Sequence, residues 1–577
     1  MTKMPAVAPM SCCKALVALI MSCLTFLPGG ALEAQVVLAP STPQVGSSNT
    51  VSADPPVPRP HGKPCTVQLF QNLEFADFNV KPFSYTPPSS CPGPWAKVVF
   101  TADFTVTAGR QFDRTAKFFL GGVNIYFGTT AEPRASLSPS WHVESDVTDL
   151  SAVFKSAQSG FANIGNFVGV SGGVNYTGII FADAQLEFYP ASFPDRDRGT
   201  RVPDVVIGLQ PDNDAATLNT TASQLSKPLT LPTNVESAYL DVVAQSQSND
   251  EFWYLCVPSD LAAALQSCGS TGFRETEVSI DGQPAGVAPV YPWIYTGGID
   301  PYLWEPIPGV QTLNFKPYRV DLTPFAGLLS DGQQHSVALS VFNADSYFAA
   351  TATLLLYTDP ESEKVTGSVV RNNLAAEPTP KVTENVTVGS NGDASGSVSV
   401  ASERQYEITG YVKTSHGIVE TTVKQALSFN NSQNFTINAT TYIQDLSQST
   451  TVKAETITRD GWFVTEENRT FSYPLTIHYG QTTNADGSFS AKTVSNQKYL
   501  ASAVLRSDGF PFSRDETSNE VASEDTLSFT SAGALTGHTG ASSQNYLTNS
   551  RGRCYSRKLT SVNSVLTGYT DGGGCPR

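Results

Sequence analysis

The feature that most constrains the fold of this chain is a recurrence of short runs in which apolar and polar residues alternate. Residues 95–107 are a long example. Alternate residues of a strand face opposite sides of a sheet, so the pattern predicts β-structure. Glycine and proline, with 44 and 38 copies, separate the runs, and no long segment has the apolar period of a helix. The sequence therefore predicts an all-β protein made of sandwiches or barrels.

The pattern of the first block of strands recurs in the second. A chain of 577 residues exceeds what one hydrophobic core accommodates. Each run of the first block has a counterpart further along, which favours two similar β-sandwiches side by side. The paired runs are 95–107 with 237–244, 111–133 with 273–282, and 141–150 with 318–325.

These pairs set the expected domain organisation. We predict a first sandwich at 64–200 and a second at 201–360, with a linker at about 190–203. Residues 361–577 are more polar and rich in threonine, and are expected to form a further β-rich C-terminal region.

The N-terminus has the pattern of a secretory signal peptide. Lys3 and Lys14 precede or begin an apolar stretch at residues 15–27, and small residues lead up to Ala34. The alternatives are a membrane anchor, for which the apolar stretch is short, and a lipid-attachment site at Cys23. We expect cleavage after residue 34, a flexible lead-in at 35–63, and a secreted, periplasmic or extracellular protein that has no membrane association once the signal is removed.

The cysteine count agrees with export. Six of the nine cysteines lie beyond the predicted signal, and an even number in an exported chain favours disulfides. Six cysteines allow 15 pairings. Pairing neighbours in the sequence gives the most economical set, which is Cys65–Cys91, Cys256–Cys268 and Cys554–Cys575.

Composition and motifs argue against several classes of function. The formal charge of -16 disfavours a nucleic-acid partner, because phosphate binding needs a basic face. No CxxC pair or His spacing suggests a metal site, so neither a metal nor a cofactor is expected. One G-x-S-x-G match begins at Gly169. A β-prone run follows it instead of a helix, so it predicts a glycine-rich hairpin and not a nucleophile elbow.

The remaining candidates for chemistry are carboxylates beside aromatic residues. Asp113-Arg114 opens a hairpin with a Gly-Gly turn, and Glu251 precedes Phe252-Trp253. Trp293 and Trp304 lie in a long aromatic loop. Such an ion pair is more often structural than catalytic. Aromatic faces with carboxylates suit a sugar ligand, and an aromatic-capped sandwich edge is the alternative.

Several motifs occur in the order found in the peptide-N-glycosidase A family, and residues 65–359 resemble that family. The family is in turn distantly similar to peptide-N-glycosidase F enzymes, which have two jelly-roll domains with the active site between them. The motifs are Phe112-Asp113-Arg114, Gly128-Thr129-Thr130-Ala131-Glu132-Pro133, Trp141-His142-Val143-Glu144, Asn249-Asp250-Glu251-Phe252-Trp253-Tyr254, Thr296-Gly297-Gly298-Ile299-Asp300-Pro301 and Asp321-Leu322-Thr323-Pro324-Phe325.

The resemblance implies hydrolysis of the bond between asparagine and the first N-acetylglucosamine of an N-glycan, with N-glycosylated peptides and glycoproteins as substrates. It implies that Asp113 is the principal catalytic residue, although Phe112 replaces the tryptophan of the F-type motif. Glu251 is the expected supporting carboxyl. The third acidic residue of the F-type enzymes has no counterpart near Gly165-Asn166.

Further residues are candidates for contacting the substrate. We expect Asp113 to activate water and Glu251, with a raised pKa, to protonate the leaving nitrogen. Arg114 is expected to hold its neighbour, the domain interface or the substrate, and the other candidates are Glu132, Trp253, Trp293 and Trp304. Rival hypotheses are a glycoside hydrolase, which also uses two carboxylates, and a non-catalytic glycan-binding protein.

Overall fold

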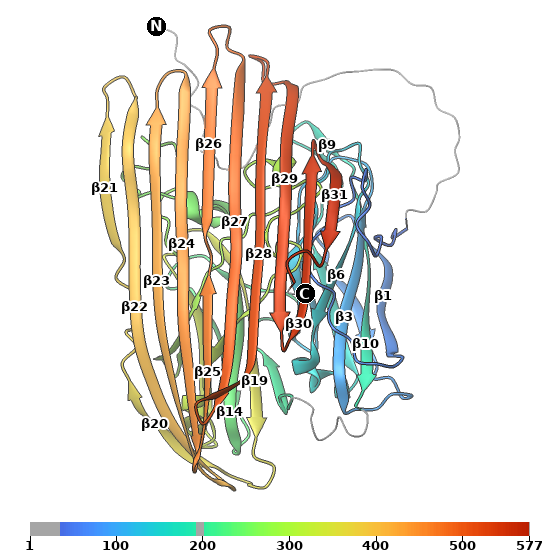
Figure 1. The fold of residues 1–577 in the computed structure, drawn as a ribbon, viewed down its shortest axis with the longest axis vertical. Coiled ribbons are helices and arrows are strands. Elements are labelled where there is room, and N and C mark those ends of the chain that lie inside the picture. The colour runs from blue at the N-terminus through green and yellow to red at the C-terminus, as the bar shows by residue number, and fades with distance from the viewer. Residues whose placement is uncertain (1–34, 192–200, 576–577) are drawn as a thin grey trace.

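The structure is a computed structural model that describes residues 35–191 and 201–575. It consists of two β-sandwiches and one very large sheet (Figure 1), so the predicted all-β class is confirmed. The expected signal peptide at 1–34 and the centre of the expected linker, 192–200, lie outside the described residues. Within the described part of the chain, no helix has the length and apolar character needed to cross a membrane.

The first sandwich is a jelly roll. Its two four-stranded sheets have the strand orders β1-β10-β3-β6 and β2-β7-β4-β5. Apart from the hairpin β4–β5, strands of these sheets that follow each other in the chain lie in opposite sheets. The strands are β1 (Cys65–Phe75), β2 (Lys81–Tyr85), β3 (Trp95–Val106), β4 (Thr115–Leu120), β5 (Val123–Thr129), β6 (Ser140–Asp146), β7 (Gln158–Ile164) and β10 (Ile180–Pro190).

The second sandwich repeats this order. Its sheets are β11-β19-β14-β17, with β12 also paired to β19, and β13-β18-β15-β16. The strands are β11 (Val205–Gly208), β12 (Ala216–Leu218), β13 (Leu225–Thr230), β14 (Val235–Gln247), β15 (Glu275–Ile280), β16 (Gln283–Pro289), β17 (Tyr318–Asp321), β18 (Gln334–Phe342) and β19 (Tyr347–Thr358).

The equivalence of runs expected from the sequence is confirmed strand by strand. β3 and β14 hold the same place in their sheets, as do β4 and β15, and β6 and β17. A short 3₁₀ helix follows β6 at Thr148–Leu150, and another follows β17 at Thr323–Phe325. The G-x-S-x-G match forms the expected hairpin, β8 (Gly169–Ser171) and β9 (Val174–Tyr176), with Gly172 and Gly173 at positive φ in its turn.

The C-terminal region is a single antiparallel sheet of 12 strands, which lies in front of the second sandwich in Figure 1. The apolar face of this sheet and the interior of the second sandwich form one continuous core, whereas the first sandwich has a core of its own. The strands are β20 (Thr366–Asn372), β21 (Lys381–Val388), β22 (Ala394–Thr414), β23 (Gly417–Ile437), β24 (Thr441–Asp460), β25 (Phe463–Ser472), β26 (Leu475–Thr483), β27 (Phe489–Ser507), β28 (Phe510–Phe529), β29 (Leu535–Ser550), β30 (Arg553–Val562) and β31 (Val565–Asp571).

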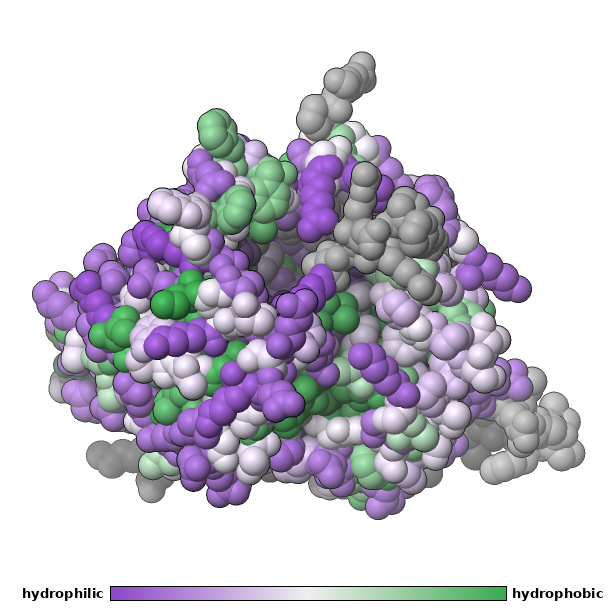
Figure 2. Space-filling view, turned by 90° about the horizontal axis from the view of Figure 1, so that it is seen from below, coloured by the Kyte–Doolittle hydropathy of each residue, from purple (hydrophilic) through white to green (hydrophobic). Residues whose placement is uncertain are grey.

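The tips of two neighbouring hairpins of this sheet stand outside the core. Trp462 and Phe463 lie at the turn from β24 to β25, and Phe510 and Phe512 follow the turn from β27 to β28; all four are exposed. Seen from below, hydrophobic side chains protrude from a largely polar surface (Figure 2).

The expectation of a flexible lead-in at 35–63 is wrong. The backbone N–H groups of Val36 and Val37 donate to side chains of the first sandwich. Ala53 is completely buried and its N–H donates to Gln544 of the large sheet. Arg59 forms ion pairs with Glu144 and Glu187. A segment without periodicity can still be fixed by such polar contacts, which a periodicity argument does not detect.

Two of the three expected disulfides are present. Cys256–Cys268 and Cys554–Cys575 are bonded, but Cys65 and Cys91 are free, so the third pairing is corrected. The buried Cys91 thiol lies 3.6 Å from the carbonyl oxygen of Phe188, to which it donates. Burial, together with the neighbouring Cys65, raises the pKa of this thiol to about 11.

Candidate active site

The β4–β5 hairpin brings two carboxyl groups together. Its turn residues, Gly121 and Gly122, have the positive φ values that a tight hairpin turn requires. The backbone N–H of Asp113, just before β4, donates to Oε2 of Glu132, just after β5, at 3.0 Å. Neighbouring Gln111 closes the same end of the hairpin, because its side chain donates to the carbonyl of Ala131. The sequence therefore places both acids at one end of the first sandwich.

A glycine of the second sandwich lies against both carboxyl groups. The N–H of Gly297 donates to Oδ2 of Asp113 at 2.9 Å. A Cβ atom on Gly297 would stand 2.1 Å from Oε2 of Glu132 and 3.1 Å from Oδ1 of Asp113. The two carboxyl oxygens thus face the same small space, and only glycine allows the backbone to approach them so closely.

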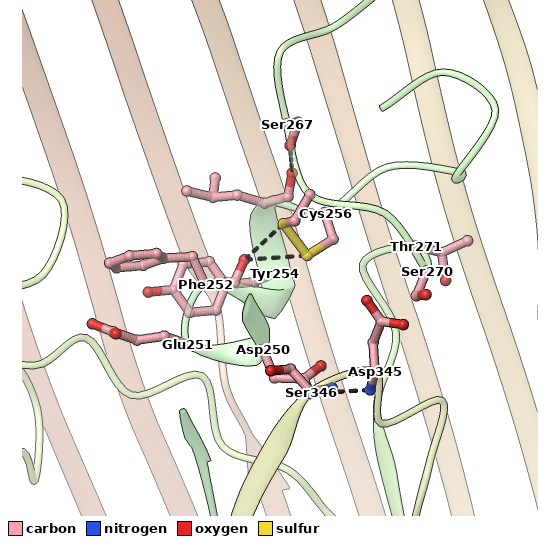
Figure 3. The surroundings of a disulfide bond; sticks show 12 residues. Asp250, Glu251, Phe252, Tyr254, Cys256, Ser267, Ser270, Thr271, Asp345 and Ser346 are labelled. Atoms are coloured by element: carbon pink, nitrogen blue, oxygen red, sulfur yellow. Dashed lines mark hydrogen bonds between the residues drawn. A yellow bond between two sulfur atoms is a disulfide. The ribbon is translucent and has the colours of Figure 1, made fainter. Parts of the chain in front are cut away.

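Glu251 is carried by a turn that a buried ion pair fixes. The turn lies between two 3₁₀ helices, Ser248–Asp250 and Trp253–Leu255. Asp250 is fully buried and accepts hydrogen bonds from the guanidinium of Arg274. Its other oxygen accepts three backbone N–H groups at residues 345–347. Glu251 points away from these contacts (Figure 3), so Asp250 holds the turn while Glu251 stays available.

The disulfide Cys256–Cys268 closes the segment that follows Glu251 (Figure 3). The carbonyl of Phe252 lies 3.9 Å from both sulfur atoms. The side chain of Ser267 donates to the carbonyl of Leu255 at 2.8 Å. These contacts restrain the backbone on the C-terminal side of Glu251, as Asp250 does on the N-terminal side.

The three carboxyl groups interact electrostatically. Burial, together with the charge of Asp113, raises the pKa of Glu132 to about 8. Burial raises the pKa of Glu251 to about 8 as well, again with a contribution from Asp113. Burial also raises the pKa of Asp113, opposed by the Gly297 hydrogen bond and by Arg114.

The charge of Asp113 acts on both glutamates and raises the pKa of each. Close carboxyl groups in a poorly solvated place cannot all be charged. The two glutamic acids, whose pKa values are raised to about 8, therefore carry their protons below that pH. Each of the three residues retains partial exposure, so a substrate can reach them.

Arg114 lies beside the carboxyl groups and does not form the simple ion pair that the sequence suggested. Its Nε donates to the side-chain oxygen of Asn166 at 3.3 Å. Asn166 is fully buried and donates to the carbonyls of Phe75 and Gly178. Where the sequence comparison looked for a third acid, the structure thus has an amide that orients Arg114.

A strip of aromatic side chains leads away from Asp113. We call Phe112, Tyr176, Phe167 and Phe78 the aromatic strip. Successive ring centroids lie 5.3, 5.9 and 6.4 Å apart. The guanidinium of Arg110 lies over both Phe112 and Tyr176. All four rings are at least partly exposed, so the strip offers aromatic faces to a ligand.

The expectation that Trp253, Trp293 and Trp304 contact a sugar is wrong. Their exposed fractions are 0%, 4% and 2%. Trp293 packs on Phe315, with ring centroids 4.4 Å apart. Trp304 donates to the carbonyl of Gly298 at 2.9 Å, and so supports the loop that carries Gly297. These residues belong to the core because the second sandwich shares that core with the large sheet.

The site lies where the two sandwiches meet. The N–H of Thr129 donates to the carbonyl of Thr312, and the N–H of Phe315 donates to the carbonyl of Phe127. Thr296 donates from its hydroxyl to the carbonyl of Thr130 at 2.7 Å. The loop 296–315 thus pairs with the end of β5, and places Gly297 next to Asp113 and Glu132.

A surface cavity of about 500 Å³ lies elsewhere on the second sandwich. Leu209, Gln210, Asp212 and Lys227 are among its lining residues. Asp113, Glu132 and Glu251 do not line it, so the candidate site is the junction of the sandwiches and not this cavity.

The sequence pointed to Asp113 and Glu251 as candidate catalytic residues, but the places of two other residues were missed. Glu132 was expected only to touch substrate, yet it accepts a hydrogen bond from Asp113. The role of Gly297 was not anticipated. The conspicuous Thr296-Gly297-Gly298 motif was the available signal, because adjacent glycines mark close backbone approaches.

Comparison with known proteins decides the family. Residues 55–375 match the family model described as peptide N-acetyl-beta-D-glucosaminyl asparaginase amidase A. Residues 397–475 match the C-terminal domain of PNGase A. The chain belongs to this amidase A family. A family relative from Prunus dulcis, named peptide-N4-(N-acetyl-beta-glucosaminyl)asparagine amidase A, is 31% identical over 398 residues, which cover 65% of this chain and 68% of the relative.

Solved structures are more distant from this member of the amidase A family. Recombinant PNGase F is 12% identical, covers 52% of this chain and 96% of its own, and has a TM-score of 0.34. PNGF-II is also 12% identical, covers 52% of this chain and 66% of its own, and has a TM-score of 0.35. The jelly-roll assignment above depends on the strand orders alone.

Proposed function

We propose that this amidase A family member hydrolyses the amide bond between an asparagine side chain and the first N-acetylglucosamine of an N-glycan. The observation that carries the proposal is that Asp113 lies close enough to Glu132 and Glu251 for its charge to raise the pKa of both. Hydrolysis of an amide needs a base for the attacking water and an acid for the leaving nitrogen. Two carboxyl groups that keep their protons up to about pH 8, beside a third that can act as the base, meet this requirement.

The proposed reaction begins when the Asp113 carboxylate takes a proton from a water molecule, whose oxygen attacks the amide carbon of the substrate asparagine. The C–N bond breaks as Glu251 gives its proton to the nitrogen. The products are an aspartate in the peptide and a glycosylamine, which reacts with a second water and loses ammonia. A proton then passes from Asp113 through solvent to Glu251, which restores the starting state.

Other residues are assigned to holding the substrate. Arg114, fixed by Asn166, and Glu132 flank Asp113 and are placed to contact the amide or the adjoining sugar. The aromatic strip supports stacking on sugar rings, whose C–H faces pack on aromatic faces. The partial exposure of the three carboxyl groups supports access by an N-glycosylated peptide or glycoprotein.

We also propose export from the cytoplasm as the setting. The segment 1–34 has the pattern of a signal peptide, and disulfides such as Cys256–Cys268 persist in oxidising compartments. N-terminal sequencing of the purified natural protein tests this. A mature chain that begins at residue 35 supports it, and an intact N-terminus contradicts it.

Mass spectrometry of a purified N-glycopeptide after incubation with the protein tests the amidase proposal. Aspartate at the former glycosylation site, with the glycan released whole, is the expected result. A peptide that keeps one or more sugars indicates a glycoside hydrolase and overturns the proposal. An unchanged glycopeptide that is retained on immobilised protein indicates a glycan-binding protein and also overturns it.

A further inference from the structure

The large C-terminal sheet buries a set of amide side chains on the face that covers the second sandwich. Buried amides are costly unless their hydrogen bonds are made. In this sheet most of them bond to the backbone of the segments beneath. The buried residues are Gln425, Asn431, Gln433, Gln444, Gln448, Gln497, Asn519 and Gln544.

One group of these amides holds the segment that follows Glu251. Asn431 and Gln433, on β23, donate to the carbonyls of Tyr254 and Cys256 at 2.7 and 2.9 Å. Gln444, on β24, donates to the carbonyl of Leu255 at 3.3 Å. Three successive carbonyls, beginning three residues after Glu251, are therefore bound by the sheet.

Gln497 holds the loop that carries Gly297. This residue, on β27, is completely buried. Its side-chain NH₂ donates to the carbonyl of Pro292 at 2.7 Å, and its side-chain oxygen accepts the N–H of Val310 at 2.8 Å. One side chain thus joins the two ends of the loop whose middle donates to Asp113.

A second strand supports the same loop. The hydroxyl of Ser523, on β28, donates to the carbonyl of Leu303 at 2.7 Å. Trp304, the next residue, donates to the carbonyl of Gly298. The sheet therefore contacts Leu303, whose neighbour Trp304 is hydrogen-bonded to Gly298, the residue next to Gly297.

We propose that the C-terminal sheet is a template for the active site, and that Gln497 is a positioning residue that sets the Gly297 N–H against Asp113. The assignment to catalysis rests on the proposed amidase function. Asp113, Glu132 and Gly297 must be held to a fraction of an ångström, because a misplacement of about 1 Å can cost 10²-fold in rate. A loop of about 20 residues with no strand of its own needs an external support to reach this precision.

Gln425 provides a matched control. It lies on β23 of the same sheet, is buried, and uses both ends of its amide as Gln497 does. Its NH₂ donates to the carbonyl of Val287, and its oxygen accepts from the hydroxyl of Tyr318. Val287 and Tyr318 are on strands of the second sandwich and not on either active-site loop.

The test compares Gln497→Ala with Gln425→Ala in the full chain. Both variants should lower Tm by similar amounts. Only Gln497→Ala should reduce kcat, by about 10- to 100-fold, with a much smaller change in KM. Hydrogen exchange of residues 292–310 should accelerate in Gln497→Ala and not in Gln425→Ala. Equal losses of kcat in the two variants would overturn the proposal.

Gln497→Glu adds a measurement, the pH dependence of kcat, that would not change if Gln497 had a purely structural role. A protonated glutamic acid has the shape of glutamine, with one donor and one acceptor, whereas its ionised form cannot donate to Pro292. The ratio of the variant's kcat to that of the wild type should rise as pH falls through the pKa of the new carboxyl. A ratio independent of pH contradicts the assignment. The Gln497→Glu measurement tests the proposal even if Gln497→Ala does not fold.

The two proposals fail in different ways. If the wild type releases no glycan, the amidase function is wrong, but hydrogen exchange at 292–310 still tests whether Gln497 holds the loop. If the wild type is active and exchange is the same in both alanine variants, the template role is wrong and the amidase function stands.

Discussion

The backbone N–H of Gly297 donates a 2.9 Å hydrogen bond to the carboxylate of Asp113, across 184 residues of sequence and the junction of two jelly rolls. Neither sandwich alone contains the site. The first supplies Asp113 and Glu132, and the second supplies Gly297 and Glu251. The proposed catalysis therefore depends on how the two sandwiches are held together.

Replacing Gly297 with alanine should abolish turnover while the protein still folds. The added Cβ would stand 2.1 Å from Oε2 of Glu132, so either the loop or the carboxyl group must move. We expect a loss of kcat of about 10²-fold or more. Gly573→Ala is the control, because no atom lies within 4 Å of its added Cβ. Equal activity of the two variants would contradict the close approach.

Activity should decline at alkaline pH. The pKa of Glu251 is raised to about 8, so this acid carries its proton below pH 8 and loses it above. The wild-type kcat should fall as pH rises through about 8. Glu251→Gln should lose roughly 10²- to 10⁴-fold in kcat and should lack this alkaline limb. If kcat of Glu251→Gln still falls as pH rises through about 8, the group that titrates is another residue, with Glu132 the first candidate.

The contributions of Glu132 and Glu144 to the stability of the protein should depend on pH in opposite directions. The pKa of Glu132 is raised to about 8 in the folded protein, so its stabilising contribution is complete below about pH 4.5 and is lost as pH rises through 8. The pKa of Glu144 is lowered to about 2 by His142 and Arg59, so its contribution is present above pH 4.5 and is lost as pH falls toward 2.

Thermal unfolding of two glutamine variants measures this difference. Glu132→Gln keeps an acceptor for the Asp113 N–H and cannot ionise, so its Tm should exceed that of the wild type at pH 8 and approach it at pH 4.5. Glu144→Gln should be less stable than the wild type at pH 7. A lower Tm for Glu132→Gln at pH 8 would show that the carboxyl is not strained by its surroundings.

Aromatic residues should divide into a binding set and a structural set. Tyr176→Ala removes a partly exposed ring of the aromatic strip, and should raise KM by about 2- to 10-fold if each stacked ring contributes about 0.5–1.5 kcal/mol. Trp253→Phe changes a completely buried ring and should lower Tm without changing KM. Initial-rate kinetics with a glycopeptide and a melting curve separate the two effects. A KM shift only in Trp253→Phe would reverse the assignment.

The strand pattern was predictable because alternation and glycine turns are local signals. For that reason the sequence could predict that β3 and β14, and β6 and β17, are equivalent strands of the two sandwiches. Asp113 and Glu251 were proposed from the order of the motifs, and their catalytic role stays a prediction. The tryptophans were misassigned because burial depends on what covers a loop, and the sheet that covers Trp253 and Trp293 comes from residues more than 100 positions away. Gln497 carried no local signal, since its partners lie on another domain.

The most direct test of the account is glycopeptide hydrolysis in heavy-oxygen water by the wild type and by Asp113→Asn. The wild type should release the whole glycan and leave an aspartate that contains one heavy oxygen, because water attacks the amide carbon. Asp113→Asn should have the same Tm and at least about 10³-fold less activity, since it removes the base. Heavy oxygen in the released sugar but not in the peptide, or full activity of Asp113→Asn, would contradict the account.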